Sequence, residues 1–337
     1  VDNYIKSMER RISSRLPACK NWGKYQFLFC DDCIGIIQAR IVPNSIGSDP
    51  DILILCGKRG HMQKTIKKSI TYSGIGLHTG NKVHLCLRPG LPDTGIIFFR
   101  SDMPDSICVP ARIEYVDNTH RGVSLRHDLT EIKTVEHILA AINGLGIDNL
   151  IIEVSAPEIP AGDGSAQVFV ELLKEASIIC QDGHESKTPI KILSPVWVST
   201  ENSHIVVLPS EDYCISFTLH LEDSFVGSQF ASFSISPEIF GQEIASARTF
   251  GFLKEVEQLK KQGLAMGGSL ENAVVIGEDN FLNSLRFKDE LVRHKILDLI
   301  GDLSLIGKPI QGHVIAVKSG HELNLSLARR MGEVGRS

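Results

Sequence analysis

The order of strand-like and helix-like segments most constrains how this chain of 337 residues can fold. Strand-like segments within 62–156 enclose one helix-like segment, "TVEHILAAINGLG", and a second one, "DGSAQVFVELLKEAS", follows at 163–177. The order then recurs, because strand-like segments fill 190–235, helix-like segments follow at 237–263 and 292–305, and a strand lies in 313–321. With 42% hydrophobic residues the chain can form two cores. We therefore predict the α+β class, with two domains that each pack a β-sheet on a helical layer.

Changes in composition indicate where the domains meet. Residues 1–61 differ in composition from the rest, since they hold half of the cysteines. We expect them to form an N-terminal extension of unknown role without fixed structure. It includes the pair Cys30 and Cys33, which is a weak metal signal because no second pair stands at a matching distance. The polar stretch "CQDGHESKTPIK" is the best linker candidate. The predicted domains are therefore 62–184 and 185–330.

Charge and cysteine usage exclude several classes of protein. The net charge of -5 argues against nucleic acid as a partner. No run of 18 apolar residues is present, so we expect no transmembrane segment. The eight cysteines are scattered, and a chain of this size does not need disulfides. A reduced, cytoplasmic setting is the prediction.

The segment "VRHKILDLIGDLSL", residues 292–305, predicts a helix with an unusual polar side. At about 100° per residue, His294, Lys295, Asp298 and Asp302 fall within an arc of about 100°. A solvated face is the ordinary interpretation, but such a face usually carries long Glu, Lys and Gln side chains. His294 and Asp298 stand at i and i+4, the spacing at which one rigid helix offers two metal ligands. We therefore expect a metal site that takes its third ligand from elsewhere.

The sequence "TVEH" offers that ligand in His137, next to Glu136. Neighbouring helix residues point about 100° apart, so these two side chains cannot easily bind one metal. One can bind while the other acts as a base, as in zinc hydrolases with three protein ligands and an open position. Spacing alone cannot join segments so distant in the chain, and a histidine satisfied at a helix edge remains the alternative.

Six ordered motifs together resemble the UDP-3-O-acyl-N-acetylglucosamine deacetylase family, over about residues 62–330. They are "GIGLHTG", "TVEHILAAINGLGIDNLIIEV", "PEIPAGDGSA", "ARTFGF", "FKDELVRHKILDLIGDLSLIG" and "VKSGHELN". The resemblance implies two similar domains that face each other with the active site between them. It also implies a cytoplasmic, monomeric zinc amidase whose partner is its substrate, UDP-3-O-acyl-N-acetylglucosamine. Hydrolysis of the N-acetyl amide, giving UDP-3-O-acyl-glucosamine and acetate, commits this precursor to lipid A.

The resemblance also assigns roles to individual residues. The implied Zn2+ ligands are His137, His294 and Asp298, with Glu136 as general base and His321 as general acid. The remaining assignments place Lys295 and Thr249 at the reacting carbonyl, Asp302 as the residue that orients His321, and Phe250 near the sugar.

An insert at about 251–269 is expected to form an apolar passage for the acyl chain. Leu264 and Met266 supply its walls, and Gly268 lets the backbone pass close to the ligand. His78 in "GLHTG" lies near the nucleotide or sugar in the family, although a structural role in the turn is an equal alternative. We expect His120, His127 and His184 at the surface.

Two alternatives to an active deacetylase stay open. One is a relative that binds the lipid-linked UDP-sugar without hydrolysing it, which loss of a ligand would support, and no ligand is missing. The other is a structural zinc protein, which predicts a fourth protein ligand that closes the site.

Overall fold

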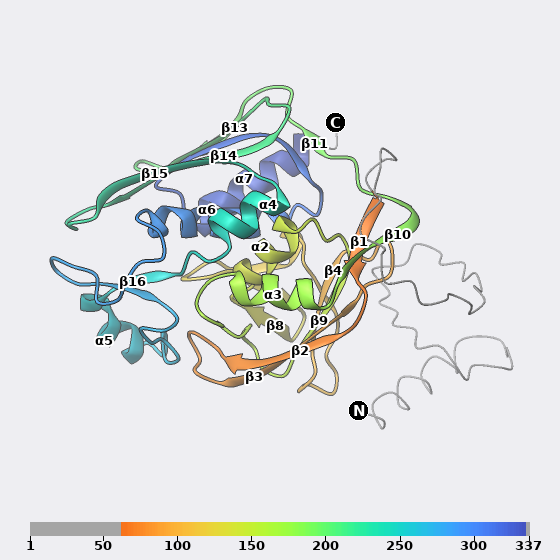
Figure 1. Ribbon diagram of the computed structural model, residues 1–337, viewed down its shortest axis with the longest axis horizontal. Coiled ribbons are helices and arrows are strands. Elements are labelled where there is room, and N and C mark those ends of the chain that lie inside the picture. The colour runs from red at the N-terminus through yellow and green to blue at the C-terminus, as the bar shows by residue number, and fades with distance from the viewer. Residues whose placement is uncertain (1–61, 335–337) are drawn as a thin grey trace, which may run out of the picture.

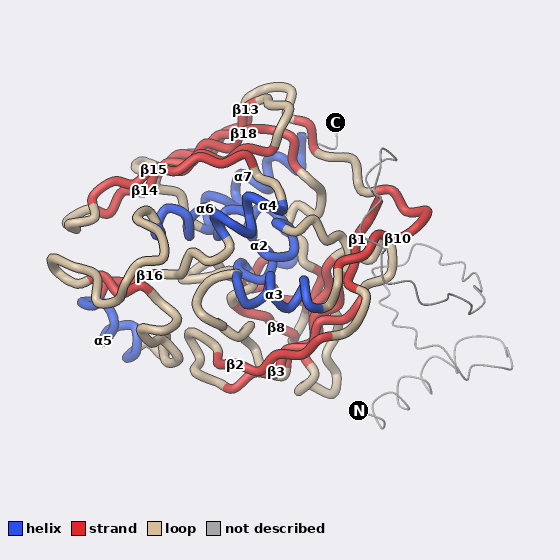
Figure 2. The backbone as a smooth tube through the Cα atoms, viewed as in Figure 1, coloured by secondary structure: helices blue, strands red, loops and turns tan. Residues whose placement is uncertain are grey.

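The computed structural model describes residues 62–334 of the chain. Two sheets form its outer layers, and helices fill the space between them (Figure 1). The same arrangement is seen when strands and helices are coloured separately (Figure 2). The structure is therefore of the α+β class, as predicted.

The first large sheet has five strands in the spatial order β2-β3-β9-β4-β5. Their bounds are β2 Ile70–Ile75, β3 Lys82–Pro89, β4 Ile96–Arg100, β5 Val109–Pro110 and β9 Leu150–Val154. Central β9 runs antiparallel to β3 and parallel to β4. Along β3, buried Val83, Leu85 and Leu87 alternate with more exposed residues, so one face of the sheet packs on the core.

The second large sheet has the path β12-β13-β18-β14-β15, with β11 beside β18. The bounds are β11 Ile190–Lys191, β12 Val196–Ser199, β13 His204–Leu208, β14 Tyr213–Leu221, β15 Gly227–Ser234 and β18 Ile310–Val317. Central β18 runs antiparallel to β13 and parallel to β14. The buried residues Ile215, Phe217 and Leu219 of β14 face the helices.

The two sheets share one topology. When the short strand β11 is left out, the first two strands of each sheet are antiparallel neighbours, and the last strand in sequence enters at the centre, next to the second and third. In each half of the described chain, which we call a block, an insert also lies between the fourth of these strands and the long helix that follows it. The first insert contains η2 Ile113–Tyr115 and the small sheet of β6 Val116–Asn118, β7 Ser124–His127 and β8 Thr130–Lys133. The second contains α4 Pro237–Ile239, η3 Phe240–Ile244, β16 Phe250–Phe252, α5 Leu253–Lys261 and β17 Val274–Ile276.

Four helices form the layer between the sheets. They are α2 Glu136–Gly144, α3 Gln167–Glu175, α6 Glu290–Ser304 and α7 His321–Val334. Helices α2 and α6 pack against each other, α3 contacts β2, α6 contacts β14 and β15, and α7 contacts β12 and β13. This central α2–α6 contact places residues from both blocks side by side.

One local prediction was wrong. Half of the expected linker is the strand β10, Ile178–Glu185, which pairs with β1, Met62–Ile66. All eight β10 residues are at least partly exposed, so the segment carries no apolar alternation that would reveal a strand.

Two groups of predictions are not tested by the described residues: those for the N-terminal extension and those for the limits of the two domains. The Cys30–Cys33 pair and the whole extension 1–61 lie outside the described residues. The domain limits at 184 and 330 stay predictions. Within 62–334, no helix is both long enough and apolar enough to span a membrane.

Candidate active site

The polar side of α6 lies inside the protein and not in water. His294 and Asp298 are each 3% exposed, and Asp302 is fully buried. Since α2 packs on α6 here, the residues that looked like a solvated face form part of an internal site. The i, i+4 spacing places His294 Nε2 3.3 Å from Asp298 Oδ1.

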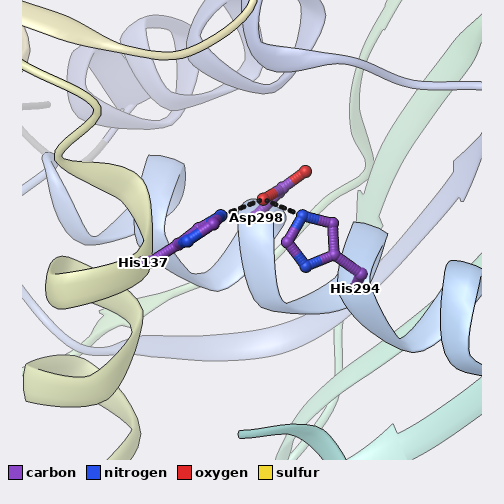
Figure 3. Close-up of side chains that lie close together, drawn as sticks. All are labelled: His137, His294 and Asp298. Carbon is purple, nitrogen blue, oxygen red and sulfur yellow. Dashed lines mark ion pairs between the residues drawn. The ribbon is translucent and has the colours of Figure 1, made fainter. Parts of the chain in front are cut away.

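His137 joins this pair from the first turn of α2. Its Nε2 atom lies 3.6 Å from Asp298 Oδ1, and its ring meets the His294 ring edge-on with centroids 5.0 Å apart. Figure 3 shows the three side chains converging from two helices. One potential ligand atom from each residue lies within 4.8 Å of the other two, so the three residues form a candidate metal-binding group.

Hydrogen bonds and charge suit this group to a cation. His294 Nδ1 donates to the Ala247 carbonyl at 3.1 Å, which leaves the Nε2 lone pair directed toward Asp298. Burial lowers the pKa of His294 to about 4, so its ring is neutral at neutral pH. Burial alone would raise the pKa of Asp298, but His294 and Lys295 hold it well below its usual range. Burial would lower the pKa of His137, but the hydrogen bond with Asp298 and the charge of Glu136 raise it.

Glu136 stands beside the candidate metal group without belonging to it. Its side chain is buried, lines the same cavity as His137, and accepts the Val123 N–H at Oε2 over 2.9 Å. Burial raises the pKa of this carboxyl group. A carboxylate with a raised pKa next to a metal site can accept a proton during a reaction.

His321, the first residue of α7, forms a second pair at the site. Its Nδ1 donates to Asp302 Oδ2 at 2.9 Å, and Asn324 Nδ2 donates to the same oxygen at 2.8 Å. Burial alone would lower the pKa of His321, but Asp302 raises it to about 9. This histidine is therefore positively charged at neutral pH, as a general acid requires.

Three other predicted residues also border the site. Lys295 Nζ donates to Asp298 Oδ2 at 2.7 Å. Burial would lower the pKa of Lys295, but Asp298 raises it, so the side chain carries a positive charge. Thr249 and Phe250 line the cavity, and the Phe250 ring lies edge-on to His294 with centroids 6.2 Å apart.

A cavity of about 730 Å³ connects these side chains. The residues predicted for catalysis and metal binding that line it are Glu136, His137, Thr249, His294, Lys295, Asp298 and His321. Phe250 and His78 also line it, and Asp302 lies behind His321. The three residues predicted for the acyl passage, Leu264, Met266 and Gly268, do not line this cavity.

Turn residues 76–80 connect the cavity to the predicted passage. Met266 N–H donates to the His78 carbonyl at 3.1 Å, and Gly267 N–H donates to the Leu77 carbonyl at 3.0 Å. His78 Nε2 donates to the Arg121 carbonyl at 3.0 Å. His78 therefore has a structural role in the turn and also reaches the cavity.

Sequence reasoning missed a buried carboxylate that holds this turn. Glu158 is fully buried and accepts the backbone N–H groups of His78 and Thr79, both at 2.8 Å. It also accepts the hydroxyl groups of Thr79 at 2.7 Å and of Thr134 at 3.2 Å. Thr134, just before Glu136, has a left-handed backbone with φ 58°, which is strained for a β-branched residue. The motif "PEIPAGDGSA" was recognised, but no spacing rule pointed to its glutamate.

One of the three surface predictions for histidines needs correction, that for His127. His120 is exposed, as predicted, and it also belongs to the cavity wall with its neighbours Asn118, Thr119 and Arg121. His127 is half-buried, because its Nδ1 donates to the Cys108 carbonyl at 2.7 Å. His184 is exposed, as predicted. The polar loop 118–121 carries no motif that would have linked it to the site.

Comparisons with known proteins agree on one family. A family model described as UDP-3-O-acyl N-acetylglycosamine deacetylase matches residues 63–333. The UDP-3-O-acyl-N-acetylglucosamine deacetylase of Chlamydia caviae is 45% identical over 276 residues, covering 81% of this chain and 97% of the relative. The protein of the same name from Histophilus somni is 45% identical over 80% of this chain and 90% of the relative. That of Syntrophotalea carbinolica is 43% identical over 80% and 87%.

Proposed function

This chain belongs to the UDP-3-O-acyl N-acetylglycosamine deacetylase family, and we propose that it hydrolyses the N-acetyl amide of UDP-3-O-acyl-N-acetylglucosamine. The products are UDP-3-O-acyl-glucosamine and acetate, and the reaction is the committed step of lipid A biosynthesis. The observation that carries this proposal is the convergence of three potential metal ligands with Glu136 on one cavity. A structural metal site would need a fourth protein ligand, whereas the group found within 62–334 has three.

Zinc is the metal we propose for this group. Two ligands held 2.0–2.2 Å from a tetrahedral zinc ion stand about 3.3–3.6 Å apart. The distances from Asp298 Oδ1 to the two histidine Nε2 atoms, 3.3 and 3.6 Å, fit that arrangement. Zinc bound there would polarise the amide carbonyl and acidify a neighbouring water molecule.

Two residues move protons in the proposed reaction. Glu136 takes a proton from the attacking water as the oxygen adds to the acetyl carbon. The C–N bond then breaks, and the amine must leave protonated because its anion is a very poor leaving group. His321 supplies that proton, since Asp302 keeps its ring charged and fixes its Nδ1, leaving Nε2–H as the remaining donor.

Two further side chains stabilise the negative charge that develops on the carbonyl oxygen. Thr249 lines the cavity, and its hydroxyl group would donate a hydrogen bond to that oxygen. The Lys295 ammonium group is held by Asp298 at 2.7 Å, so its charge is fixed beside the reacting atoms.

The substrate extends from the metal along the cavity and across its rim. Phe250 packs near the sugar and His78 lies at the nucleotide or sugar end. We place the acyl chain over the partly exposed surface beside the 76–80 turn, where Met266 is 54% exposed and Ile75 is 48% exposed. Leu264 and Gly268 lie two residues before and two residues after Met266 in the sequence. Each buried methylene group of the acyl chain would contribute about 0.8 kcal/mol.

We propose that the enzyme acts in the cytoplasm. We also propose that it is a monomer. One chain supplies every residue assigned to the reaction, so the proposed mechanism requires no residue from a second subunit.

Activity and metal content measured together test this function. The purified protein should release acetate from UDP-3-O-acyl-N-acetylglucosamine, lose this activity with a chelator, and regain it with stoichiometric zinc. His294→Ala should bind less zinc and remain inactive when zinc is added. A wild-type protein that binds the substrate yet releases no acetate with zinc bound would instead support the non-catalytic relative.

A further inference from the structure

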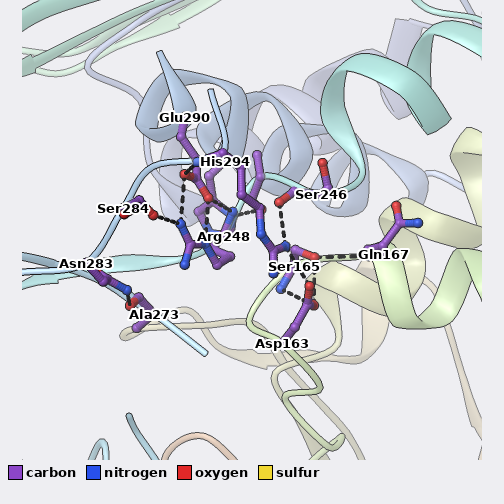
Figure 4. Close-up of polar contacts among 12 residues, drawn as sticks. Asp163, Ser165, Gln167, Ser246, Arg248, Ala273, Asn283, Ser284, Glu290 and His294 are labelled. Carbon is purple, nitrogen blue, oxygen red and sulfur yellow. Dashed lines mark hydrogen bonds and ion pairs between the residues drawn. The ribbon is translucent and has the colours of Figure 1, made fainter. Parts of the chain in front are cut away.

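The backbone segment 246–249 carries two groups that the site uses. The Ala247 carbonyl accepts the Nδ1–H of His294 at 3.1 Å, which fixes the tautomer and the ring orientation of this ligand. Two residues later, Thr249 lines the cavity. Arg248 lies between them, and its side chain runs in the opposite direction, toward the start of α6 (Figure 4).

Arg248 forms a buried, two-pronged ion pair with Glu290, the first residue of α6. Its Nε donates to Glu290 Oε1 at 2.8 Å and its Nη2 donates to Oε2 at 3.1 Å. The Arg248 side chain is 8% exposed and the Glu290 side chain is fully buried. The same carboxylate accepts the backbone N–H of Arg248 at 3.0 Å, so it holds the main chain of the segment as well as the guanidinium group.

Further contacts remove the remaining freedom of the pair. Arg248 Nη2 donates to the Ser284 carbonyl at 2.6 Å, and Glu290 Oε2 accepts the Arg286 N–H at 2.6 Å. The segment is also held from its other side, because Thr249 N–H donates to the Gly164 carbonyl at 2.8 Å. Glu290 therefore fixes the segment relative to the same helix that carries His294 and Asp298.

We propose that Arg248 and Glu290 are positioning residues, which together hold the Ala247 carbonyl and the Thr249 hydroxyl in register with the ligands on α6. This inference rests on the proposed function, because it assigns the two positioned groups to a metal ligand and to the reacting carbonyl. Neither Arg248 nor Glu290 lines the cavity, so both act through their neighbours.

A role in stability alone would have a different signature. A buried ion pair is weak evidence for stability, and well-packed apolar residues often replace one without loss. An apolar pair, however, offers no acceptor for the Arg248 backbone N–H, so it cannot hold the main chain of segment 246–249 in its orientation. Positioning and stability can therefore be separated by replacing both residues at once.

The single variants Arg248→Lys and Glu290→Ala are measured first, for metal affinity by chelator competition and for kcat and KM. Loss of the neighbour that orients a ligand typically lowers metal affinity about 10- to 100-fold. We expect that loss, together with a fall in kcat of about 100-fold and a smaller change in KM. Glu290→Gln keeps one acceptor oxygen for the Arg248 backbone and should recover part of both losses.

The double variant Arg248→Met/Glu290→Leu guards against simple unfolding. It leaves no uncompensated buried charge, so its thermal unfolding temperature should lie above those of the single variants, although the backbone N–H groups of Arg248 and Arg286 lose their acceptor. Its metal affinity and kcat should stay low. Recovery of metal affinity and kcat along with stability would overturn the proposal.

Arg293→Met is the matched control on the same helix. Arg293 pairs with Asp289 and Glu243, both at 2.7 Å, but does not line the cavity. Its metal affinity should be unchanged whatever its stability, and an equal loss in this control would also count against positioning. If the wild-type protein binds zinc but releases no acetate, the proposed function is wrong, while the metal affinities still decide whether the pair orients His294.

Discussion

The main chain of Glu136 lies directly against Gly301. A Cβ atom added to Gly301 would stand 2.1 Å from the Glu136 carbonyl oxygen, closer than two such atoms can approach. The first turn of α2 can therefore reach α6 only because position 301 has no side chain. This close approach brings His137 to Asp298, and with it the third potential ligand to the metal group.

Gly301→Ala should push α2 away from α6 and weaken metal binding. Forcing a methyl group into a packed contact costs roughly 1–3 kcal/mol, and we expect metal affinity to fall roughly 10- to 100-fold. Gly332→Ala in α7 is the control, because its Cβ would meet nothing within 4 Å. That change should stabilise the helix by roughly 0.5–1 kcal/mol. Unfolding and metal titration of both variants provide the comparison, and wild-type metal affinity in Gly301→Ala would contradict the expectation.

Glu136→Gln should keep the metal and lose the reaction. The amide oxygen can still accept the Val123 N–H, so the local structure should survive. Removal of a positioned general base should lower kcat by about 100-fold or more. Metal content measured on the same sample separates this result from ligand loss. If the metal disappears as well, Glu136 is a ligand and its assignment as the base is wrong.

Activity should fall on the alkaline side as His321 loses its proton. Its pKa in the folded protein, about 9, lies above the unfolded value of about 6.5. The Asp302–His321 pair therefore contributes its full stabilisation at pH values below the pKa of histidine in the unfolded chain. This contribution is lost as pH rises through about 9. The alkaline limb of the pH–kcat profile should lie near that pH, and Asp302→Asn should move it to lower pH. An unchanged limb in Asp302→Asn would exclude His321 as the group responsible.

Glu158→Gln should loosen the turn that carries His78. An amide has one acceptor oxygen, and its NH2 group would face the donors that the carboxylate now accepts. Leaving these buried groups unsatisfied costs about 1–3 kcal/mol, measurable as a lower free energy of unfolding in urea. Glu153→Gln, which breaks a partly exposed pair with Arg88, should cost about 0–1 kcal/mol. Equal effects of the two changes would mean that Glu158 is not a fixed support.

A chain that begins at Met62 should retain full activity. The family match starts at residue 63, and the Chlamydia caviae relative is covered over 97% of its length without residues 1–61. We expect kcat/KM of the shortened chain to equal that of the whole chain. A start at Lys67 is the contrasting variant, because it removes β1 and its pairing with β10, and should destabilise the fold. A Met62 chain that folds but is inactive would show that the extension contributes to catalysis.

Most elements of the fold were accessible from hydrophobic pattern alone. Strands such as β3 alternate buried and exposed residues, and the segment "TVEHILAAINGLG" contains the helix α2, as its pattern predicted. The strand β10 was missed because none of its residues is buried. The equal topology of the two sheets was also hidden, since the entry of β9 and β18 at the centre depends on pairing between distant segments.

The sequence by itself determined the chemistry available to this protein. It placed His294 and Asp298 one helical turn apart, because the α-helix has a fixed local geometry, and its motifs identified the family. The tertiary structure alone decided which distant groups meet. His137 joins the ligands through the α2–α6 contact at Gly301, and Glu290 anchors the segment that carries Thr249. No local rule covers such contacts, because they depend on how whole helices and loops pack, and a difference of one side chain at position 301 would separate them.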